Sequence, residues 1–334
     1  MKYYLPRLFS AARNITILTL IIFMGLSSTA NANYSDQDDV KKFVNEMVEK
    51  HGFNKGEVET LLAGAEKKQS ILDAISRPAE KRLEWRGYRK IFLTNDRISR
   101  GKVFLKEYAD AFERAEKEFG VPREVVAAII GVETRYGKNR GSYRVIDALS
   151  TLAFDYPPRS KFFRGELEQV LLLSREQSFN PQDLKGSYAG AMGYGQFIPS
   201  SYRNFAVDFD GDGVADILNN PVDAIGSVAN YFKQHKWTEG KPVAGIAKVD
   251  GTKYEQAIYP NLKPKFTLEE MKSWGISSVD GFDLKEKGKL LKLEGKKGTE
   301  FWVSMHNFYV ITRYNHSHLY AMAVYQLSEE LKSK

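Results

Sequence analysis

The most informative stretch of the sequence is GVPREVVAAIIGVETRYGKNRG, residues 120–141. Proline in a first helical turn loses no intrahelical hydrogen bond, so Pro122 predicts the start of a helix. Apolar residues then recur at helical spacing and mark the face turned to the core: Val126, Ile129 and Ile130. Glu133 continues this face, and Gly137 and Gly141 predict that the helix ends soon after it.

Glu133 is therefore a candidate catalytic acid. A carboxylate on an apolar face costs free energy unless it is paired or stays protonated. Burial would raise its pKa towards the range in which it can give up a proton near neutral pH. The alternative is a structural carboxylate neutralised by a nearby arginine, of which there are three: Arg135, Arg140 and Arg144. The spacing alone leaves both interpretations open.

The chain has 334 residues, which is long enough for about two domains and a sizeable core. Its composition is that of a globular protein, with 43% hydrophobic and 27% charged residues. Aromatic residues make up 13%, including 18 Tyr and 4 Trp. Aromatic faces stack on sugars and on bases, so this content favours a binding groove without saying which polymer fills it.

Residues 1–32 have the pattern of a secretory signal peptide. A basic segment comes first, with Lys2, Arg7 and Arg13, and residues 15–26 form an apolar segment of secretory length. Ala-Asn-Ala at 30–32 fits the cleavage pattern, so we expect the mature chain to begin near residue 33. An uncleaved membrane anchor is the alternative, although the apolar segment is short for a bilayer span.

The sequence contains no cysteine, which excludes a disulfide and a lipid attached at a cysteine after the signal. We expect such an exported chain in the periplasm of a Gram-negative bacterium. The net charge of +7 falls to +4 without the signal, which contributes three positive residues and no acid. This mild positive balance suits an anionic polymer or an ordinary solvated surface, and the lack of a dense basic run argues against nucleic acid.

Hydrophobic periodicity divides the chain after the signal into four parts. We expect an all-helical N-terminal domain, a core that contains Glu133, a small β-containing lobe, and a C-terminal segment that returns to the helical body. Their boundaries are 33–119, 120–240, 241–305 and 306–334.

Three segments carry more specific predictions. Residues 97–119 are expected to form one amphipathic helix that ends at Gly120. Residues 267–274 predict the one small helix inside the β-containing lobe. The aromatic run at 306–314 favours β structure, and the chain then returns to helix.

The stretch KGSYAGAMGYGQFIPSSY, residues 185–202, has the most unusual composition in the chain. Four glycines fall within ten residues, and glycine lets a backbone approach a ligand closely. Ser187 and Gln196 place a hydroxyl and an amide among them. A phosphate-binding loop needs Lys-Ser/Thr after its glycines, which this stretch lacks. The alternative is a flexible surface loop, but that would leave Met192 and Phe197 in water.

The next stretch, DFDGDGVADILNNPVD, residues 208–223, resembles an EF-hand calcium loop. Carboxylates take the first, third and fifth positions: Asp208, Asp210 and Asp212. The carbonyl of Val214 takes the seventh position, but Asn219 stands at the twelfth, where a bidentate Glu is expected. We therefore predict a longer loop closed by Asp223. A turn rich in Asp and Gly that binds no metal is the alternative.

Three motifs together resemble the membrane-bound lytic murein transglycosylase B family. They are GVETRYG at 131–137, GSYAGAMGYGQFIPSSY at 186–202, and the aspartate loop followed by PVDAIGSVANYF at 221–232. The resemblance runs from WRGYRKIF, beginning at Trp85, to ITRYN, beginning at Ile311. It implies a mainly α (α+β) fold with a lysozyme-like helical core, an all-helical N-terminal domain and a small β-containing lobe.

The resemblance also implies a reaction. Family members cleave the MurNAc–GlcNAc β-1,4 bond of peptidoglycan without consuming water and leave a 1,6-anhydroMurNAc end. Glu133 would be the only catalytic carboxylate, acting first as the acid and then as the base. Ordinary retaining and inverting glycosidases need two carboxylates. Here the N-acetyl group of the substrate is implied to assist, so that no second acid is required.

Further roles come from the same resemblance. Ser187 and Gln196 would line the site beside Glu133, with Ser187 in contact with the muramoyl N-acetyl group. Sugar and peptide subsites would be lined by Tyr88, Arg159, Tyr231, Tyr314, Asn315 and Tyr320. A structural calcium ion, Ca2+, would be bound by Asp208, Asp210, Asp212, the Val214 carbonyl and Asp223.

The resemblance implies no organic cofactor. The expected ligand is the peptidoglycan glycan strand, and the protein is expected to be a monomer. Other cell-wall enzymes are possible partners, on which the sequence gives no information. Two features depart from the family pattern: the calcium loop is one residue longer, and the lipid-attachment cysteine is absent. Two alternative functions stay open, a muramidase that adds water and a non-catalytic peptidoglycan-binding module.

Overall fold

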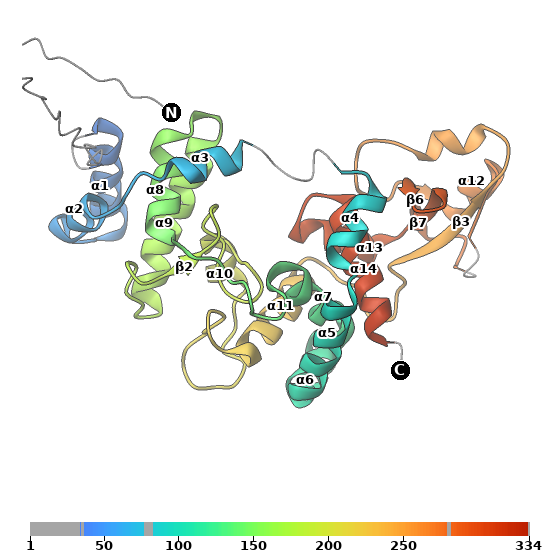
Figure 1. Ribbon diagram of the computed structural model, residues 1–334, viewed down its shortest axis with the longest axis horizontal. Coiled ribbons are helices and arrows are strands. Elements are labelled where there is room, and N and C mark those ends of the chain that lie inside the picture. The colour runs from blue at the N-terminus through green and yellow to red at the C-terminus, as the bar shows by residue number, and fades with distance from the viewer. Residues whose placement is uncertain (1–33, 35–36, 77–82, 279–281, 333–334) are drawn as a thin grey trace, which may run out of the picture. The chain divides into compact units, whose positions relative to one another are not determined.

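A computed structural model describes residues 34, 37–76, 83–278 and 282–332 (Figure 1). The predicted signal peptide lies outside these residues. Within them, the chain forms fourteen α-helices and seven short strands. The prediction of a mainly helical fold with a small β-containing region is confirmed. The domain boundaries given above stay a prediction.

Four helices come first along the chain. They are α1 (Asp38–His51), α2 (Lys55–Ala63), α3 (Gln69–Ile75) and α4 (Trp85–Phe92). The end of α1 is fixed by Gly52, whose φ of 65° lets its backbone N–H reach the carbonyls of Met47 and Val48. The side chain of Asn54 caps the start of α2 by accepting from the Glu57 N–H. Helix α1 packs on α2, and α4 packs on α14 (His318–Lys332).

The expected helix over 97–119 is wrong as a single element. The structure has two helices there, α5 (Asn95–Glu107) and α6 (Ala109–Phe119). They are separated at Tyr108, where φ is −110° and ψ is 32°. The break lets the ring of Phe104 contact the rings of both Tyr108 and Phe112. Val103 on α5 is 62% exposed.

The helical body is built around α7 (Arg123–Thr134), in which nine of twelve residues are buried. It packs against α5, α6, α14 and α11 (Pro221–Gln234). Helices α8 (Val145–Asp155) and α9 (Ser160–Glu176) form a second packed pair, joined through the 3-10 turn η3 (Pro157–Arg159). Helix α10 (Pro199–Phe205) packs on both α9 and α11. Most of the buried apolar side chains belong to this one continuous core.

The β-containing region is a five-stranded antiparallel sheet in the order β4-β6-β7-β3-β5. Its strands are β3 (Ala244–Val249), β4 (Phe266–Thr267), β5 (Ile276–Ser278), β6 (Lys287–Gly295) and β7 (Gly298–Ser304). Helix α12 (Leu268–Ser273) confirms the helix expected at 267–274, and the short 3-10 helix η4 (Lys253–Ala257) was not expected. A small separate core, with Met271, Leu290 and Val303 among its members, lies against this sheet.

The β structure expected at 306–314 is wrong, because these residues form helix α13 (His306–Tyr314). Its first turn is fixed by buried Asn307, whose amide group donates to the carbonyls of Thr238 and Lys241 at 2.8 and 2.9 Å. Helix α14 then follows, as expected. Among the residues that the structure describes, no helix is both long and apolar enough to cross a membrane.

Candidate active site

Glu133 is the penultimate residue of α7, and its side chain is half-buried. The helix ends directly after it because Arg135 and Tyr136 take positive φ angles of 52° and 58°. Left-handed backbone at two successive non-glycine residues is unusual and costs free energy. The chain is therefore turned away from the helix axis immediately past Glu133, which leaves its carboxylate at the helix end.

Tyr320 makes a polar contact with Glu133 that holds the carboxylate in position. Its hydroxyl donates to Oε1 of Glu133 at 2.6 Å. Tyr320 is 3% exposed on α14, and burial, followed by the negative charge of Glu133, raises the pKa of its hydroxyl well above the ordinary value. The hydroxyl therefore stays protonated and can only donate to the carboxylate, as a charge-assisted hydrogen bond.

A second tyrosine, Tyr314, lies beside the same carboxylate. Burial and the charge of Glu133 raise the pKa of its hydroxyl well above the ordinary value, and this hydroxyl donates to the carbonyl of Gly195 at 2.5 Å. Its ring lies 4.7 Å from the ring of Tyr231. The Tyr231 hydroxyl donates to the carbonyl of Arg313 at 2.6 Å, and burial raises its pKa to about 12.

Tyr88 and Asn315 complete this side of the site. Tyr88 is 4% exposed on α4, and it lies close enough to Tyr320 to contribute to the raised pKa of that hydroxyl. Asn315 directly follows Tyr314 and ends α13, with a half-buried side chain. The predicted tyrosines thus come from four helices, α4, α11, α13 and α14. Tyr320 and Tyr314 interact with Glu133, and Tyr88 and Tyr231 interact with those two tyrosines.

The glycine-rich loop is brought to α7 by a short two-stranded pairing. Strand β1 (Tyr143–Arg144) pairs antiparallel with β2 (Lys185–Gly186), and Ser187 follows directly. Oγ of Ser187 accepts from the N–H groups of Ala189 and Ala191 at 3.3 and 3.1 Å. These bonds fold residues 187–191 into a tight turn, so the surface-loop alternative does not describe this segment.

Gln196 is held in the same loop with a positive φ of 51°. Its amide nitrogen, Nε2, lies 3.1 Å from the carbonyl of Arg140 and 3.0 Å from that of Gly193. Gln196 therefore links the segment after Glu133 to the loop. Met192 and Phe197, which a wet loop would expose, are 0% and 2% exposed.

Two of the three arginines proposed as neutralising partners have other contacts. Arg140 donates to the carbonyl of Leu218 at 2.6 Å and lies over the ring of Tyr194. Arg144 forms an ion pair with Asp147 at 2.7 Å. The guanidinium groups of Arg140 and Arg144 are thus engaged by groups other than Glu133.

Arg159 is the one predicted residue that these contacts do not join to the site. It is exposed at the end of η3 and lies over the ring of Phe162 at 4.2 Å. It lines a separate hollow of about 740 Å³ together with buried Glu166, whose carboxylate accepts from the N–H and hydroxyl of Ser200 at 2.9 and 2.7 Å. The role of Arg159 in a subsite stays a prediction.

The aspartate loop brings the predicted carboxylates together. Ligand oxygens of Asp208, Asp210 and Asp212 all lie within 4.8 Å of one another, and all three residues are exposed. Asp208 accepts three backbone N–H groups, with that of Gly213 at 2.7 Å, and these bonds lower the pKa of its carboxyl group. Three carboxyl groups converge there, and a hard divalent cation such as Ca2+ fits that set of oxygen donors.

Asp223 has a different environment from the other three acids. It is 0% exposed at the start of α11, and burial raises the pKa of its carboxyl group. Oδ1 accepts from the N–H groups of Phe209 and Asp210, and Oδ2 accepts from that of Asp216 at 2.8 Å. Asp223 therefore ties the ends of the loop together through backbone N–H groups, and its part as a metal ligand stays a prediction.

Sequence reasoning did not single out Thr134, the neighbour of Glu133. It is 0% exposed, and its hydroxyl oxygen lies 2.9 Å from the carbonyl of Tyr194 and accepts from the Gly137 N–H at 2.9 Å. It thus joins the end of α7 to the glycine-rich loop. The available signal was its position directly before the left-handed turn, where a short hydroxyl side chain can bond to the backbone.

Comparison with known proteins assigns the chain to a family. Residues 35–329 match the family model described as the transglycosylase SLT domain. The chain belongs to this family. The membrane-bound lytic murein transglycosylase B of Escherichia coli (strain K12) is 42% identical over 306 residues, which are 89% of this chain and 83% of that protein. The activity class follows: the chain is a lytic murein transglycosylase.

Solved structures of related proteins agree with this family assignment. Catenated lytic transglycosylase SltB1 from Pseudomonas aeruginosa is 52% identical, with a TM-score of 0.86 over 89% of this chain and 98% of that one. The Escherichia coli lytic transglycosylase Slt35 in complex with calcium is 42% identical, with a TM-score of 0.83 over 90% and 94%. SltB3 from P. aeruginosa in complex with NAG-anhNAM-pentapeptide is 31% identical, with a TM-score of 0.78 over 88% and 78%. The expected lysozyme-like fold class is thereby confirmed.

Proposed function

We propose that this transglycosylase SLT family member cleaves the β-1,4 bond between MurNAc and GlcNAc of peptidoglycan without adding water. Glu133 protonates the glycosidic oxygen as the bond to C1 of MurNAc breaks. As a carboxylate, it then takes the proton from the C6 hydroxyl of the same MurNAc, whose oxygen attacks C1. The products are a GlcNAc end and a 1,6-anhydroMurNAc end, and Glu133 regains its proton. A related protein bound to NAG-anhNAM-pentapeptide supports this assignment.

The hydrogen bond from Tyr320 to Glu133 is the observation that carries the proposal. A carboxylate that must give and then regain one proton needs a fixed position and a partner that does not take the proton away. A hydroxyl with a raised pKa meets the second requirement. Ser187, Gln196 and the tyrosines around Glu133 hold the sugars, with Ser187 on the N-acetyl group of MurNAc. Asn315 and, further out, Arg159 contact the strand or its peptide.

We also propose that Asp208, Asp210, Asp212 and the Val214 carbonyl bind a structural calcium ion, with Asp223 closing the loop. A related structure in complex with calcium supports this assignment. The protein would act in the periplasm, as a monomer, after export by residues 1–32. Its partner there is the glycan strand.

The decisive test is digestion of purified sacculi followed by mass spectrometry. The expected products carry anhydroMurNAc ends, and Glu133→Gln abolishes them. The matched control is Glu124→Gln, which removes the carboxylate in the first turn of the same helix and should leave the products unchanged. Products heavier by one water would assign a muramidase instead. Binding to sacculi with no released product would assign a non-catalytic module.

A further inference from the structure

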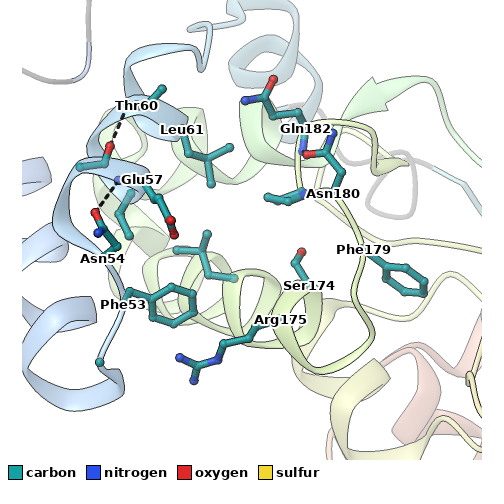
Figure 2. Close-up of a pocket in the computed structure, with 15 residues that line it drawn as sticks. Phe53, Asn54, Glu57, Thr60, Leu61, Ser174, Arg175, Phe179, Asn180 and Gln182 are labelled. Carbon is teal, nitrogen blue, oxygen red and sulfur yellow. Dashed lines mark hydrogen bonds between the residues drawn. The ribbon is translucent and has the colours of Figure 1, made fainter.

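A second hollow, of about 750 Å³, lies between α2 with the end of α1 and the C-terminal end of α9 with the loop at 177–182 (Figure 2). Its size is within the range of small-molecule sites, about 300–1,000 Å³. It shares no residue with the Glu133 site or the aspartate loop. The proposed reaction and the structural ion therefore give it no role.

The lining of this hollow combines apolar and polar side chains. Val58, Leu61 and Leu171 supply its apolar part, here called the floor, and Phe53 also lines it, with the Arg175 guanidinium 4.2 Å over its ring. Figure 2 shows Leu61 and Ser174 directed into the space from opposite sides. An apolar floor with a few convergent polar groups is the composition of a ligand site.

Ser174 is the residue that points to a ligand. Its side chain is 4% exposed, and its hydroxyl has no hydrogen-bond partner among the residues that the structure describes. A buried hydroxyl without a partner costs free energy, and a ligand group that bonds to it recovers that cost. The exposed Gln182 also lines the hollow, so the lining offers neutral polar groups from α9 and from the following loop.

The charges around the hollow indicate a neutral ligand. Its lining holds one acidic residue, Glu57, and one basic residue, Arg175. The guanidinium is already engaged, since it donates to the carbonyl of His51 at 2.8 Å in addition to its contact with Phe53. An anionic ligand such as a peptide stem would find no net positive charge in this lining, since Glu57 balances Arg175. A sugar offers apolar ring faces for the floor and hydroxyl and acetamido groups for Ser174, Gln182 and Glu57.

We propose that this hollow is a second saccharide site, which binds an N-acetylated hexosamine segment of a glycan strand apart from the bond that is cut. The inference rests on the proposed function, because the glycan strand is the polymer that this enzyme is proposed to act on. A strand held here keeps the enzyme on the sacculus while Glu133 acts on another segment or another strand.

The test is titration of ¹⁵N-labelled protein carrying Glu133→Gln with the β-1,4-linked tetrasaccharide of N-acetylglucosamine, followed by NMR. This variant cannot turn over the ligand, so the readout is independent of the proposed reaction. The expected result is saturable shifts in the backbone amides of residues 52–61 and 174–182 and in the side-chain amide of Gln182. Ser174→Ala should weaken this binding about tenfold, as loss of one hydrogen bond does.

Ser150→Ala is the matched control. Ser150 on α8 is also buried with an unpartnered hydroxyl in the described part of the chain, but it does not line the hollow. Its variant should bind as the parent does. If the NMR spectrum of Ser174→Ala shows that this variant does not fold, Gln182→Ala replaces it in the binding test, because Gln182 is exposed. Three results would overturn the proposal. They are shifts confined to the Glu133 site, an affinity that neither Ser174→Ala nor Gln182→Ala changes, and shifts caused by a free stem tetrapeptide but not by the tetrasaccharide.

Discussion

Tyr320 donates a hydrogen bond of 2.6 Å to Glu133 from 187 positions further along the chain. The bond joins the last helix of the described chain to the end of α7, so the candidate acid is positioned by an element outside the central motifs. Neither residue's own helix fixes the contact. It exists because α14 packs along α7, and both helices bury apolar side chains, Ala323 and Ile130 among them, at 0% exposure.

Replacing Tyr320 with Phe should lower the rate of anhydro-product release by about 10- to 100-fold, because Glu133 loses the donor that orients it. The apolar ring stays in place, so the free energy of unfolding should fall by only about 1 kcal/mol. The control is Tyr325→Phe on the same helix, which removes a hydroxyl that donates to the Ala244 carbonyl at 2.8 Å. Equal rates for the two variants would show that the Tyr320 hydroxyl has no part in catalysis.

Gly141→Ala should destabilise the fold by about 3 kcal/mol or more and weaken activity together with it. The φ of Gly141 is 93°, and a Cβ there would lie 2.1 Å from the backbone of Gly186, next to Ser187. Gly251→Ala separates the cost of a positive φ from the cost of the clash. The φ of Gly251 is also positive, at 67°, but no atom lies within 4 Å of the added Cβ. This substitution should cost only about 1 kcal/mol. Chemical denaturation of both variants gives the comparison; similar losses would contradict the close approach of the two loops.

The sequence was sufficient to predict Glu133 near a helix end, because apolar spacing and a following glycine are local signals. It could not predict the partners of Glu133, since Tyr320 and Tyr314 reach it only through the packing of α13 and α14. The same limit applies to α13 itself. Phe308, Val310 and Ile311 favour strand by intrinsic preference, but burial of these side chains against the helical body outweighs that preference.

No local feature of the sequence predicts the break between α5 and α6. Residues 97–119 contain no proline and only one glycine, Gly101, so their pattern is that of a continuous helix. A Cβ at Gly101 would clash with the Tyr136 hydroxyl at 2.2 Å, which shows how closely α5 approaches the turn after Glu133. On either side of the bend at Tyr108 the two helices have different main partners: α5 packs on α7 and α14, and α6 packs chiefly on α11. A bend set by tertiary packing of this kind is not encoded in local helix propensity.

Calcium should raise the melting temperature of the protein by several degrees at a concentration about 100 times the dissociation constant, where binding to the folded state alone adds about 2.7 kcal/mol. A chelator should reverse the shift. Asp212→Asn should abolish it, because one of the three converging carboxylates is lost. Asp250→Asn, at an exposed acid outside the loop, should keep it. Thermal melts with calcium, magnesium and chelator give the result, and identical curves in all three would exclude the metal site.

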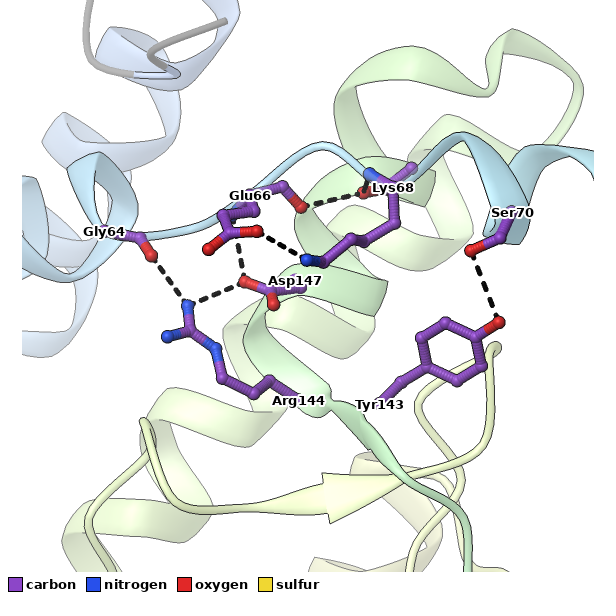
Figure 3. A network of polar contacts seen from close by, with 8 residues as sticks. Gly64, Glu66, Lys68, Ser70, Tyr143, Arg144 and Asp147 are labelled. Atoms are coloured by element: carbon purple, nitrogen blue, oxygen red, sulfur yellow. Dashed lines mark hydrogen bonds and ion pairs between the residues drawn. The ribbon is translucent and has the colours of Figure 1, made fainter. Parts of the chain in front are cut away.

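Asp147→Ala should cost about 3 kcal/mol in the free energy of unfolding. Asp147 is 3% exposed and accepts from the Glu66 N–H at 2.9 Å while it pairs with Arg144 (Figure 3). The substitution leaves the part-buried Glu66 N–H without its acceptor and the Arg144 guanidinium without its carboxylate, although Arg144 keeps its hydrogen bond to the carbonyl of Gly64. Asp39→Ala, in an exposed pair with Lys42, should change the stability by less than about 0.5 kcal/mol. Denaturant titrations of the two variants that gave equal midpoints would contradict this account of the network.

Lys289→Met should stabilise the protein at pH 7 by about 1–3 kcal/mol. Lys289 is 5% exposed on β6, with its ammonium 3.9 Å from the centre of the Tyr259 ring, and burial lowers its pKa to about 8. Between pH 8 and the ordinary pKa of 10.5, the unfolded chain binds more protons than the folded one. Stability should therefore rise with pH in this window, and below it the cost of burying the charge is fully present.

The gain from Lys289→Met should consequently be largest at pH 7 and shrink towards pH 10, where the native lysine is neutral when folded. Lys292→Met, at an exposed position on the same strand, controls for the general effect of removing one positive charge and should show no such pH dependence. Thermal melts of both variants and the parent across pH 7–10 measure the difference. A gain from Lys289→Met that stayed constant over this range would mean that the pKa of Lys289 is the same in the folded and the unfolded chain, and the burial argument for it would fail.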